Sequence, residues 1–198
     1  MEARSHNVTW HAGGVERARR AEATGGAGAT VWLTGLPASG KSTIAVALEA
    51  ALLHRKRAAY LLDGDNLRHG LNGNLGFSAE DRGENVRRTG EVARLFADAG
   101  VVAVVSLVSP YEADRVRVRA LHEAQGLPFL EVFVDTPLEE CERRDPKGLF
   151  ARARAGELKG MTGIDDPYEA PRSPELHLKP LEQTVDESVA TLLARLAG

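Results

Sequence analysis

The sequence predicts an α/β fold in which a parallel sheet is covered on both faces by helices. Three observations predict it. Short apolar segments rich in β-branched residues alternate with longer segments of helical periodicity. A glycine-rich loop joins the first apolar segment directly to the first helical one. Finally, 198 residues, 43% of them hydrophobic, are enough for one domain with a sizeable core. In such folds, ligands bind beyond the carboxyl ends of the strands.

Five apolar segments are the expected strands. The segment VVAVVSLV is the most apolar run of the chain, which is typical of a strand buried on both faces. It is far too short to cross a bilayer. In chain order, the expected strands cover residues 30–34, 58–62, 101–108, 129–135 and 175–178.

Helices are expected between these strands and after the last one. In the first helix, Ile44 and Leu48 recur at helical spacing. The second begins at Ser78, which has capping-box spacing to Asp81, and Gly100 suits its end. The expected helices cover residues 41–57, 78–100, 111–125 and 185–196, and PLEECERR (137–144) contains a further helix start.

The chain is expected to comprise an N-terminal extension, residues 1–28, and one domain, residues 29–198. The Gly/Ala-rich stretch 22–30 is interpreted as a flexible lead-in to the first strand. A basic, glycine-punctuated region at 143–163 is interpreted as a lid that closes over phosphates and excludes water, with an ordinary basic surface helix as the alternative. The cations of this region are Arg143, Arg144, Lys147, Arg152, Arg154 and Lys159.

The composition argues against several classes of partner. With 25 Lys and Arg against 28 Asp and Glu, the formal net charge is −3, which gives no general attraction to nucleic acid or to anionic membranes. The N-terminus lacks the apolar run of a signal peptide. The single cysteine, Cys141, fits a reducing compartment and is expected to be a small packed residue. We therefore expect a soluble cytoplasmic protein that binds neither nucleic acid nor membrane.

The stretch GLPASGKST (35–43) fits the phosphate-binding pattern G-x-x-x-x-G-K-[ST]. Its position between a strand and a helix is the required context, and it predicts a P-loop NTPase-type three-layer domain. Backbone N–H groups and the helix N-terminus would cradle the phosphates of a nucleoside triphosphate. Lys41 is expected to reach the β- and γ-phosphates, Ser42 to bind Mg²⁺, and Thr43 to support the α-phosphate region. The candidate ATP-binding residues are Gly35, Ala38, Ser39, Gly40, Lys41, Ser42 and Thr43, with Arg152 of the basic region.

The stretch DGDN (63–66) follows the second expected strand, so that two carboxylates lie near the phosphates. Asp63 and Asp65 suit Mg²⁺ solvation and capture of a hydroxyl proton. The alternative interpretation is an Asx-type turn, because Asp, Gly and Asn are common turn residues.

No expected strand ends in the usual acid that activates water in an ATPase. The strand at 101–108 is followed by Ser109 and Pro110. Asp135 could serve an ATPase, but DTP more often begins a helix, with Asp135 or Thr136 as its cap. This pattern favours phosphate transfer to an acceptor over hydrolysis.

The stretch DRGENVRR places Arg82, Asn85 and Thr89 near one face of a helix. Such a face can bind an anionic, hydrogen-bonding acceptor, and the alternative is a solvated, charged helix start. Phe77, just before this helix, is either a hydrophobic staple or a ring that packs against a base.

The P-loop, DGDNLRHGLN, LGFS, DRGENVRR, SPY, KGLF and GMTGIDDPYEAP occur in this order, and NVTWH precedes them. Over nearly the whole chain, this run closely resembles the adenylylsulfate kinases (APS kinases). The resemblance implies transfer of the γ-phosphate of MgATP to the 3′-hydroxyl of adenosine 5′-phosphosulfate (APS). The products would be 3′-phosphoadenosine 5′-phosphosulfate (PAPS) and ADP.

The resemblance also implies an acceptor site. Phe77 would stack on the adenine, Arg82 and Asn85 would anchor the phosphosulfate and ribose, and Asp65 would orient the attacking hydroxyl. By position, the residues that match the family's APS contacts are Asp65, Arg68, Phe77, Arg82, Asn85, Val108, Ser109, Lys147, Met161 and Thr162.

Ser109 occupies the position that some descriptions of the family assign to a phosphoserine intermediate. A direct in-line transfer in a ternary complex explains every motif without it, so we expect Ser109 to bind APS. The candidate catalytic residues are Lys41, Asp63, Asp65 and Ser109. The candidate ligands of Mg²⁺ are Ser42 and Asp63.

Further expectations follow from the resemblance. Met161 stands where the family usually has Phe, and a thioether can still cover an adenine. The chain is too short to include an ATP sulfurylase domain, so APS would come from a separate enzyme. A homodimer is expected because the family is usually dimeric.

Two other functions fit part of the sequence. A kinase for another small hydroxyl acceptor, such as a nucleoside or a sugar acid, would keep the P-loop and lid but would not need Phe77, Arg82, Asn85 and Lys147 together. A nucleotide-binding regulator would respond to ATP or ADP and ignore APS.

Overall fold

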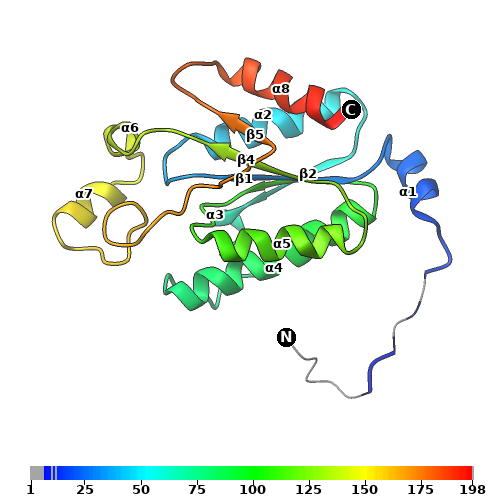
Figure 1. Cartoon of the computed structure of the whole chain (residues 1–198), viewed down its shortest axis with the longest axis horizontal. Coiled ribbons are helices and arrows are strands. Elements are labelled where there is room, and N and C mark those ends of the chain that lie inside the picture. Colours follow the sequence, from blue (N-terminus) through cyan, green and yellow to red (C-terminus); the bar gives the residue numbers. More distant parts are fainter. Residues whose placement is uncertain (1–6, 10, 12, 198) are drawn as a thin grey trace.

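The computed structural model of the chain describes residues 7–9, 11 and 13–197, and its centre is a parallel sheet with the strand order β2-β3-β1-β4-β5 (Figure 1). All five predicted strands are confirmed. β3 ends before the predicted Val108, because the chain leaves the sheet to form a loop. The strands are β1 (Ala29–Thr34), β2 (Ala59–Asp63), β3 (Val102–Ser106), β4 (Phe129–Val134) and β5 (Leu176–Leu178).

Helices cover both faces of the sheet, as predicted: α2 and α8 pack on one face, and α4 and α5 on the other (Figure 1). The α4 cap is confirmed, since Ser78 Oγ accepts a hydrogen bond from the Asp81 backbone N–H at 3.1 Å. The helices of the described residues are α1 (Arg17–Thr24), α2 (Lys41–His54), α3 (Gly64–Leu67), α4 (Ala79–Asp98), α5 (Glu112–Glu123), α6 (Leu138–Arg144), α7 (Leu149–Arg154) and α8 (Val185–Ala197). None of them is both long and apolar enough to cross a membrane.

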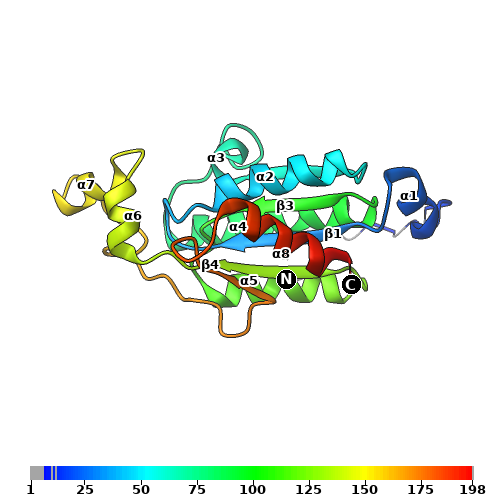
Figure 2. The same cartoon turned by 90° about the horizontal axis from the view of Figure 1, so that it is seen from above.

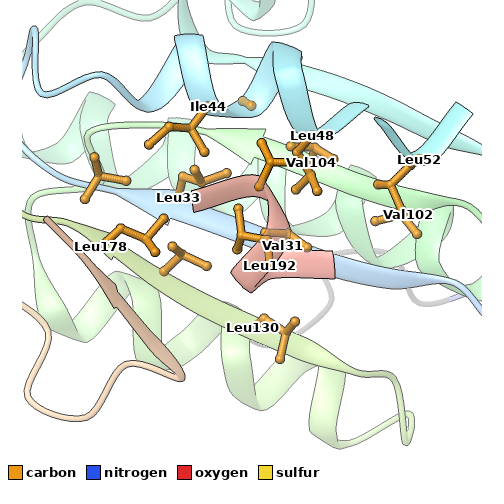
Figure 3. Close-up of a cluster of buried hydrophobic side chains, with 14 residues drawn as sticks. Val31, Leu33, Ile44, Leu48, Leu52, Val102, Val104, Leu130, Leu178 and Leu192 are labelled. Atoms are coloured by element: carbon orange, nitrogen blue, oxygen red, sulfur yellow. The ribbon is translucent and has the colours of Figure 1, made fainter. Parts of the chain in front are cut away.

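Alternate residues of β1 build the two sides of the core. Val31 and Leu33 face α2 and α8, where they pack against Leu48 and Leu192 (Figure 3). Trp32 faces α4 and α5 in a second cluster. All of these side chains have 0% exposure, so the central strand is buried on both faces.

The helices α4 and α5 approach each other closely at Gly90. A Cβ atom at this position would lie 2.7 Å from a methyl group of Val118 on α5. Glycine therefore allows the two helices to pack together at this point.

The strand order places the P-loop at the edge where ligands bind. β1 pairs with β3 on one side and with β4 on the other, both in parallel, and the chain reverses its direction of winding at this point. The loop between β1 and α2 therefore opens into the crevice beyond the carboxyl ends of the strands.

The N-terminal region differs from its prediction. The proposed flexible lead-in at 22–30 is wrong at both ends, because α1 extends to Thr24 and β1 begins at Ala29. Arg17 and Arg20 pair with Asp98 of α4 at 2.9 and 2.5 Å, which ties α1 to the domain. Trp10 of the NVTWH motif lies outside the described residues.

The helix that follows β4 is confirmed as α6, but the prediction of its cap is wrong. Its N-cap is Pro137, without a side-chain hydrogen bond. Thr136 Oγ1 instead donates to the Ser39 carbonyl at 2.8 Å. The hydroxyl that was expected to cap the helix supports the P-loop.

Candidate active site

A cavity of about 670 Å³ opens at the carboxyl ends of the strands. It brings together groups from the P-loop, from β2 and α3, from α4, from the loop after β3, and from the α6–α7 region. The predicted site residues that line it are Ala38, Ser39, Gly40, Lys41, Ser42, Thr43, Asp63, Asp65, Arg68, Phe77, Arg82, Asn85, Val108, Ser109, Lys147, Met161 and Thr162.

Gly40 and Lys41 begin helix α2. Gly40, the N-cap, has a φ angle of 104°, a left-handed conformation that favours glycine, and the first residues of α2 line the cavity with it, where helix N-terminal N–H groups can bind phosphate. Lys41 Nζ donates to the carbonyls of Gly35 and Leu36 at 3.0 and 2.7 Å. Gly35 therefore contributes through its carbonyl and does not line the cavity.

The ammonium group of Lys41 is held in a buried position. The side chain has 7% exposure, and this burial lowers its pKa from 10.5 to about 8. Asp63 and Asp65 oppose the decrease through their negative charges. A bound phosphate would also raise the pKa of Lys41, because a nearby negative charge favours the protonated amine.

Asp63 forms the Asx-type turn considered for it and also contacts the P-loop. One carboxylate oxygen accepts from the Asp65 backbone N–H at 3.0 Å, forming the Asx-type turn that begins α3. The other accepts from Ser42 Oγ at 2.8 Å, and Ser42 Oγ lies 3.1 Å from Ser106 Oγ.

Ser42 and Asp63 suit Mg²⁺. They supply hard oxygen atoms, and the P-loop places their contact next to the phosphate site. Mg²⁺ commonly takes one or two protein oxygens and completes its coordination with water and substrate phosphates. Within the described residues, no group of three or more His, Cys, Asp or Glu side chains could hold a metal ion.

Asp65 forms an ion pair with Lys147, which lies between α6 and α7. The two side chains are 68% and 56% exposed. Exposed ion pairs contribute little net stability, so either partner can exchange for a ligand at small cost.

Phe77 is exposed between two guanidinium groups. Its exposure is 63%, which does not fit a staple packed against the helix. Arg68 Cζ lies 4.2 Å from the ring centroid, and Arg82 Cζ lies 5.6 Å away. The ring is available to a ligand, and the two cations beside it favour an anionic one.

The predicted polar face of α4 is divided between the cavity and the interior. Arg82 borders the cavity and donates to the Gly160 carbonyl at 2.6 Å. Asn85 also borders the cavity with only 3% exposure. Thr89 is fully buried and faces Asn72 rather than the cavity. The alternative of a solvated helix start is wrong for these three residues.

Ser109 lines the cavity, but its hydroxyl group is already hydrogen-bonded. Its Oγ accepts from Trp32 Nε1 at 3.1 Å and donates to Thr34 Oγ1 at 3.0 Å. Its backbone has a φ angle of 40°, which is uncommon for a residue with a side chain, and buried Arg115 donates to its carbonyl at 2.7 Å. This environment holds the loop after β3 in place, and neither hydrogen-bond partner of the hydroxyl found among the described residues is a base.

The α6–α7 region projects from the sheet at the end opposite α1 (Figures 1 and 2). It has a small core of its own, formed by Cys141, Phe150 and Met161, against which P-loop residues Leu36 and Ala38 also pack. Burial raises the pKa of Cys141 to about 11, as befits a packed thiol. Met161 has 6% exposure and both borders the cavity and contributes to this core.

Most of the basic side chains in this region have acidic partners. Arg143 and Arg144 both pair with Glu140, at 2.7 and 2.8 Å, and Arg154 pairs with Glu142 at 2.5 Å. Arg152 pairs with Glu157 at 3.9 Å and is not brought to the cavity. Its contact with ATP remains a prediction.

Ser106 and Arg144 are among the cavity residues that sequence reasoning did not assign to the site, whereas Asp135, considered for an ATPase, is not a cavity residue. Ser106, the last residue of β3, could have been found as the first polar residue at the end of a buried strand. Arg144 borders the cavity and reaches the Ala38 carbonyl at 3.4 Å, but it was treated only as part of a basic region. Asp135 lies outside the cavity lining and pairs with His177 at 2.7 Å.

Comparison with known proteins identifies the family. A family model described as adenylylsulphate kinase matches residues 27–179. The chain belongs to the adenylylsulfate kinase family. It is 55% identical to the adenylyl-sulfate kinase of Saccharomyces bayanus over 192 residues, covering 97% of this chain and 95% of that protein. It is 54% identical to the enzyme of Lactiplantibacillus plantarum over 194 residues, covering 98% and 93%.

Solved structures agree with this adenylylsulfate kinase assignment. The fold is similar to that of the Mycobacterium tuberculosis APS kinase CysC in complex with AMPPNP and APS, with 51% identity and a TM-score of 0.84 over 87% of this chain and 99% of that one. A gluconokinase from Sinorhizobium meliloti, at 20% identity and a TM-score of 0.54, shares the fold alone.

Proposed function

We propose that the chain transfers the γ-phosphate of ATP to the 3′-hydroxyl of APS, giving PAPS and ADP. The observation that carries the proposal is that one cavity joins the P-loop to an exposed aromatic ring flanked by Arg68 and Arg82. A phosphate donor and an anionic nucleotide acceptor would therefore meet between Lys41 and Phe77.

The donor phosphates bind to the N-terminus of α2 and to Lys41. When ATP arrives, Lys41 Nζ exchanges the carbonyls of Gly35 and Leu36 for phosphate oxygens. Mg²⁺ would be held by Ser42 and Asp63, and it neutralises charge on the transferring group when bound.

The acceptor binds on the opposite side of the cavity. Phe77 stacks on the adenine, while Arg68, Arg82 and Asn85 bind the phosphosulfate and ribose. Val108, Ser109, Met161 and Thr162 complete the wall around the nucleotide.

Asp65 orients the attacking hydroxyl. Lys147 first releases Asp65, whose carboxylate then accepts the proton of the 3′-hydroxyl. A bond forms between the 3′-oxygen and the γ-phosphorus as the bond to the β-phosphate bridging oxygen breaks. Lys147 then pairs with the negative charge of the transferring phosphate. Ser109 takes no covalent part.

The α6–α7 region acts as a lid. Its core packs on the P-loop residues Leu36 and Ala38, so that it closes over the phosphates and excludes water during transfer. Arg152 reaches ATP only when the lid closes. In this proposal the kinase domain begins at residue 29, and the lid comprises residues 143–163.

The remaining partners follow from the family. We place the reaction in the cytoplasm, with Mg²⁺ as cofactor, a separate ATP sulfurylase supplying APS, and two copies of the chain forming a homodimer. The hexameric APS kinase from Thiobacillus denitrificans is similar to this chain at 35% identity and a TM-score of 0.67.

The test compares ligand-induced melting shifts with turnover. Melting temperature is measured with ADP, with APS, and with both, using adenosine 5′-monophosphate as a control that lacks the sulfate. ADP release from ATP is then followed with and without APS, and with Mg²⁺ omitted. The proposal predicts that APS and ADP both raise the melting temperature and that ADP release requires APS and Mg²⁺. A response to ADP alone, with no effect of APS, would identify a nucleotide-binding regulator instead.

A further inference from the structure

Asn72 is a buried polar residue that the proposed reaction does not use directly. It lies between α3 and α4, has 0% exposure, and is not among the residues that line the cavity. Its side-chain nitrogen Nδ2 donates to Asn85 Oδ1 at 3.0 Å and lies 3.5 Å from Thr89 Oγ1. Among the described residues, no group donates to Asn72 Oδ1. A buried acceptor without a partner is uncommon and needs a physical explanation.

The contact with Asn85 explains the orientation of the Asn72 amide: Nδ2 faces Asn85 Oδ1, and Asn72 Oδ1 is left on the other side without a partner among the described residues. An amide side chain offers an acceptor on one side and two donors on the other. Asn85 Oδ1 accepts from Asn72 and, at 3.4 Å, from Thr89 Oγ1. Asn85 also borders the cavity. Since its oxygen is directed inward, its Nδ2 group is the one that remains for a ligand.

We propose that Asn72 is a positioning residue that fixes the Asn85 amide with its donor side facing the acceptor substrate. Without this anchor the amide can rotate and present its oxygen to the cavity. An oxygen there would repel the anionic, oxygen-rich acceptor. The proposal rests on the proposed function, because it assigns the ligand of Asn85 to the APS side of the cavity.

The backbone of Asn72 is anchored independently of its side chain. Its N–H donates to the Leu67 carbonyl at 2.9 Å, and its carbonyl accepts from the Leu75 N–H at 3.1 Å. These two bonds hold the loop between Arg68 and Phe77. A substitution that changes only the Asn72 side chain therefore leaves the loop's main-chain contacts available and acts first on Asn85.

The test is Asn72→Leu, which keeps similar volume and removes both the donor and the unpartnered acceptor. We expect the KM for APS to rise about tenfold, as for loss of one well-placed hydrogen bond to a charged ligand, with the KM for ATP and the melting temperature little changed. Asn74→Leu is the matched control, because Asn74 is on the same loop, is exposed, and contacts Arg88 rather than Asn85. It should leave the KM for APS unchanged.

A double-mutant cycle separates positioning from loop stability. Asn85→Ala should raise the KM for APS by a similar factor, and adding Asn72→Leu to it should have no further effect. Independent, multiplying effects would overturn the proposal, as would a wild-type KM for APS in Asn72→Leu. If Asn72→Leu does not fold, Asn72→Ser is used in the same cycle. Failure of wild-type protein to use APS would instead overturn the proposed function.

Discussion

Lys41, on the donor side of the cavity, is buried and held by two backbone carbonyls, whereas Lys147, on the lid side, is more than half exposed and held by one carboxylate. The donor side is continuous with the main core through α2, from Ile44 to Leu52. The lid has only the small core around Phe150. The comparison indicates that the phosphate site is already formed in this structure, and we infer that the proposed lid exchanges its weak contacts as substrates enter.

The largest effect is expected at the donor side. Lys41→Met should lower kcat/KM by about a thousandfold, because it removes a buried cation from the charge that develops during phosphoryl transfer. The measurement is APS-dependent ADP release, with melting temperature as the control for folding. If the variant kept more than a tenth of wild-type activity, the donor site would be wrongly assigned.

A smaller effect on kcat/KM is expected at the lid. Phe150→Ala should cost the lid about 3–5 kcal/mol of local packing free energy and raise the KM for both substrates about tenfold. Because the lid has a core of its own, the main melting transition should change little, while protease cleavage within 143–163 becomes faster. Leu48→Ala, in the main core, is the matched control and should lower the melting temperature of the whole domain. If both variants lowered the melting temperature equally, the lid would not have a core separate from the main core.

Features that depend on local sequence could be predicted on both the donor side and the lid side of the cavity. The strands and the P-loop depend on local patterns: VVAVVSLV is apolar except for Ser106, and GLPASGKST specifies its own geometry. The ion pairs of Arg143 and Arg144 with Glu140 could also be predicted from the sequence, because they occur at i, i+3 and i, i+4 spacing.

Other features depend on contacts between distant segments. Helix α1 has no buried residues, so no apolar face marks it in the sequence. It is held by ion pairs with Asp98, which lies about 80 positions away along the chain. The Ser109 environment likewise combines Trp32 and Thr34 of β1 with the loop after β3. No local pattern could have indicated that this hydroxyl is already satisfied.

Ser109→Ala tests that environment with a still smaller expected effect on activity. It should lower kcat less than tenfold and destabilise the protein by about 1–3 kcal/mol, because Trp32 Nε1 and Thr34 Oγ1 lose a buried partner. Intact mass of wild-type protein during turnover should show no phosphoenzyme. Loss of all turnover in a folded variant, together with a phosphorylated wild-type intermediate, would support the phosphoserine route.

The smallest effect near neutral pH concerns the protonation of Lys41. Its pKa in the folded protein is about 8, so kcat/KM for ATP should fall to half its maximum near that pH and decline further above it. Lys41→Arg, whatever its absolute rate, should lack this decline. The folded state binds fewer protons than the unfolded state between about 8 and 10.5, so the free energy of unfolding should rise with pH in that window. A flat activity profile to pH 9.5 would contradict the shifted pKa.

The most direct test of the account is the fate of the phosphate that leaves ATP. ADP, PAPS and inorganic phosphate are measured in one reaction containing MgATP and APS, with PAPS identified by mass. Transfer within a closed site predicts that ADP and PAPS rise together and that inorganic phosphate stays at the protein-free background. ADP accompanied by inorganic phosphate, or formed equally without APS, would contradict it.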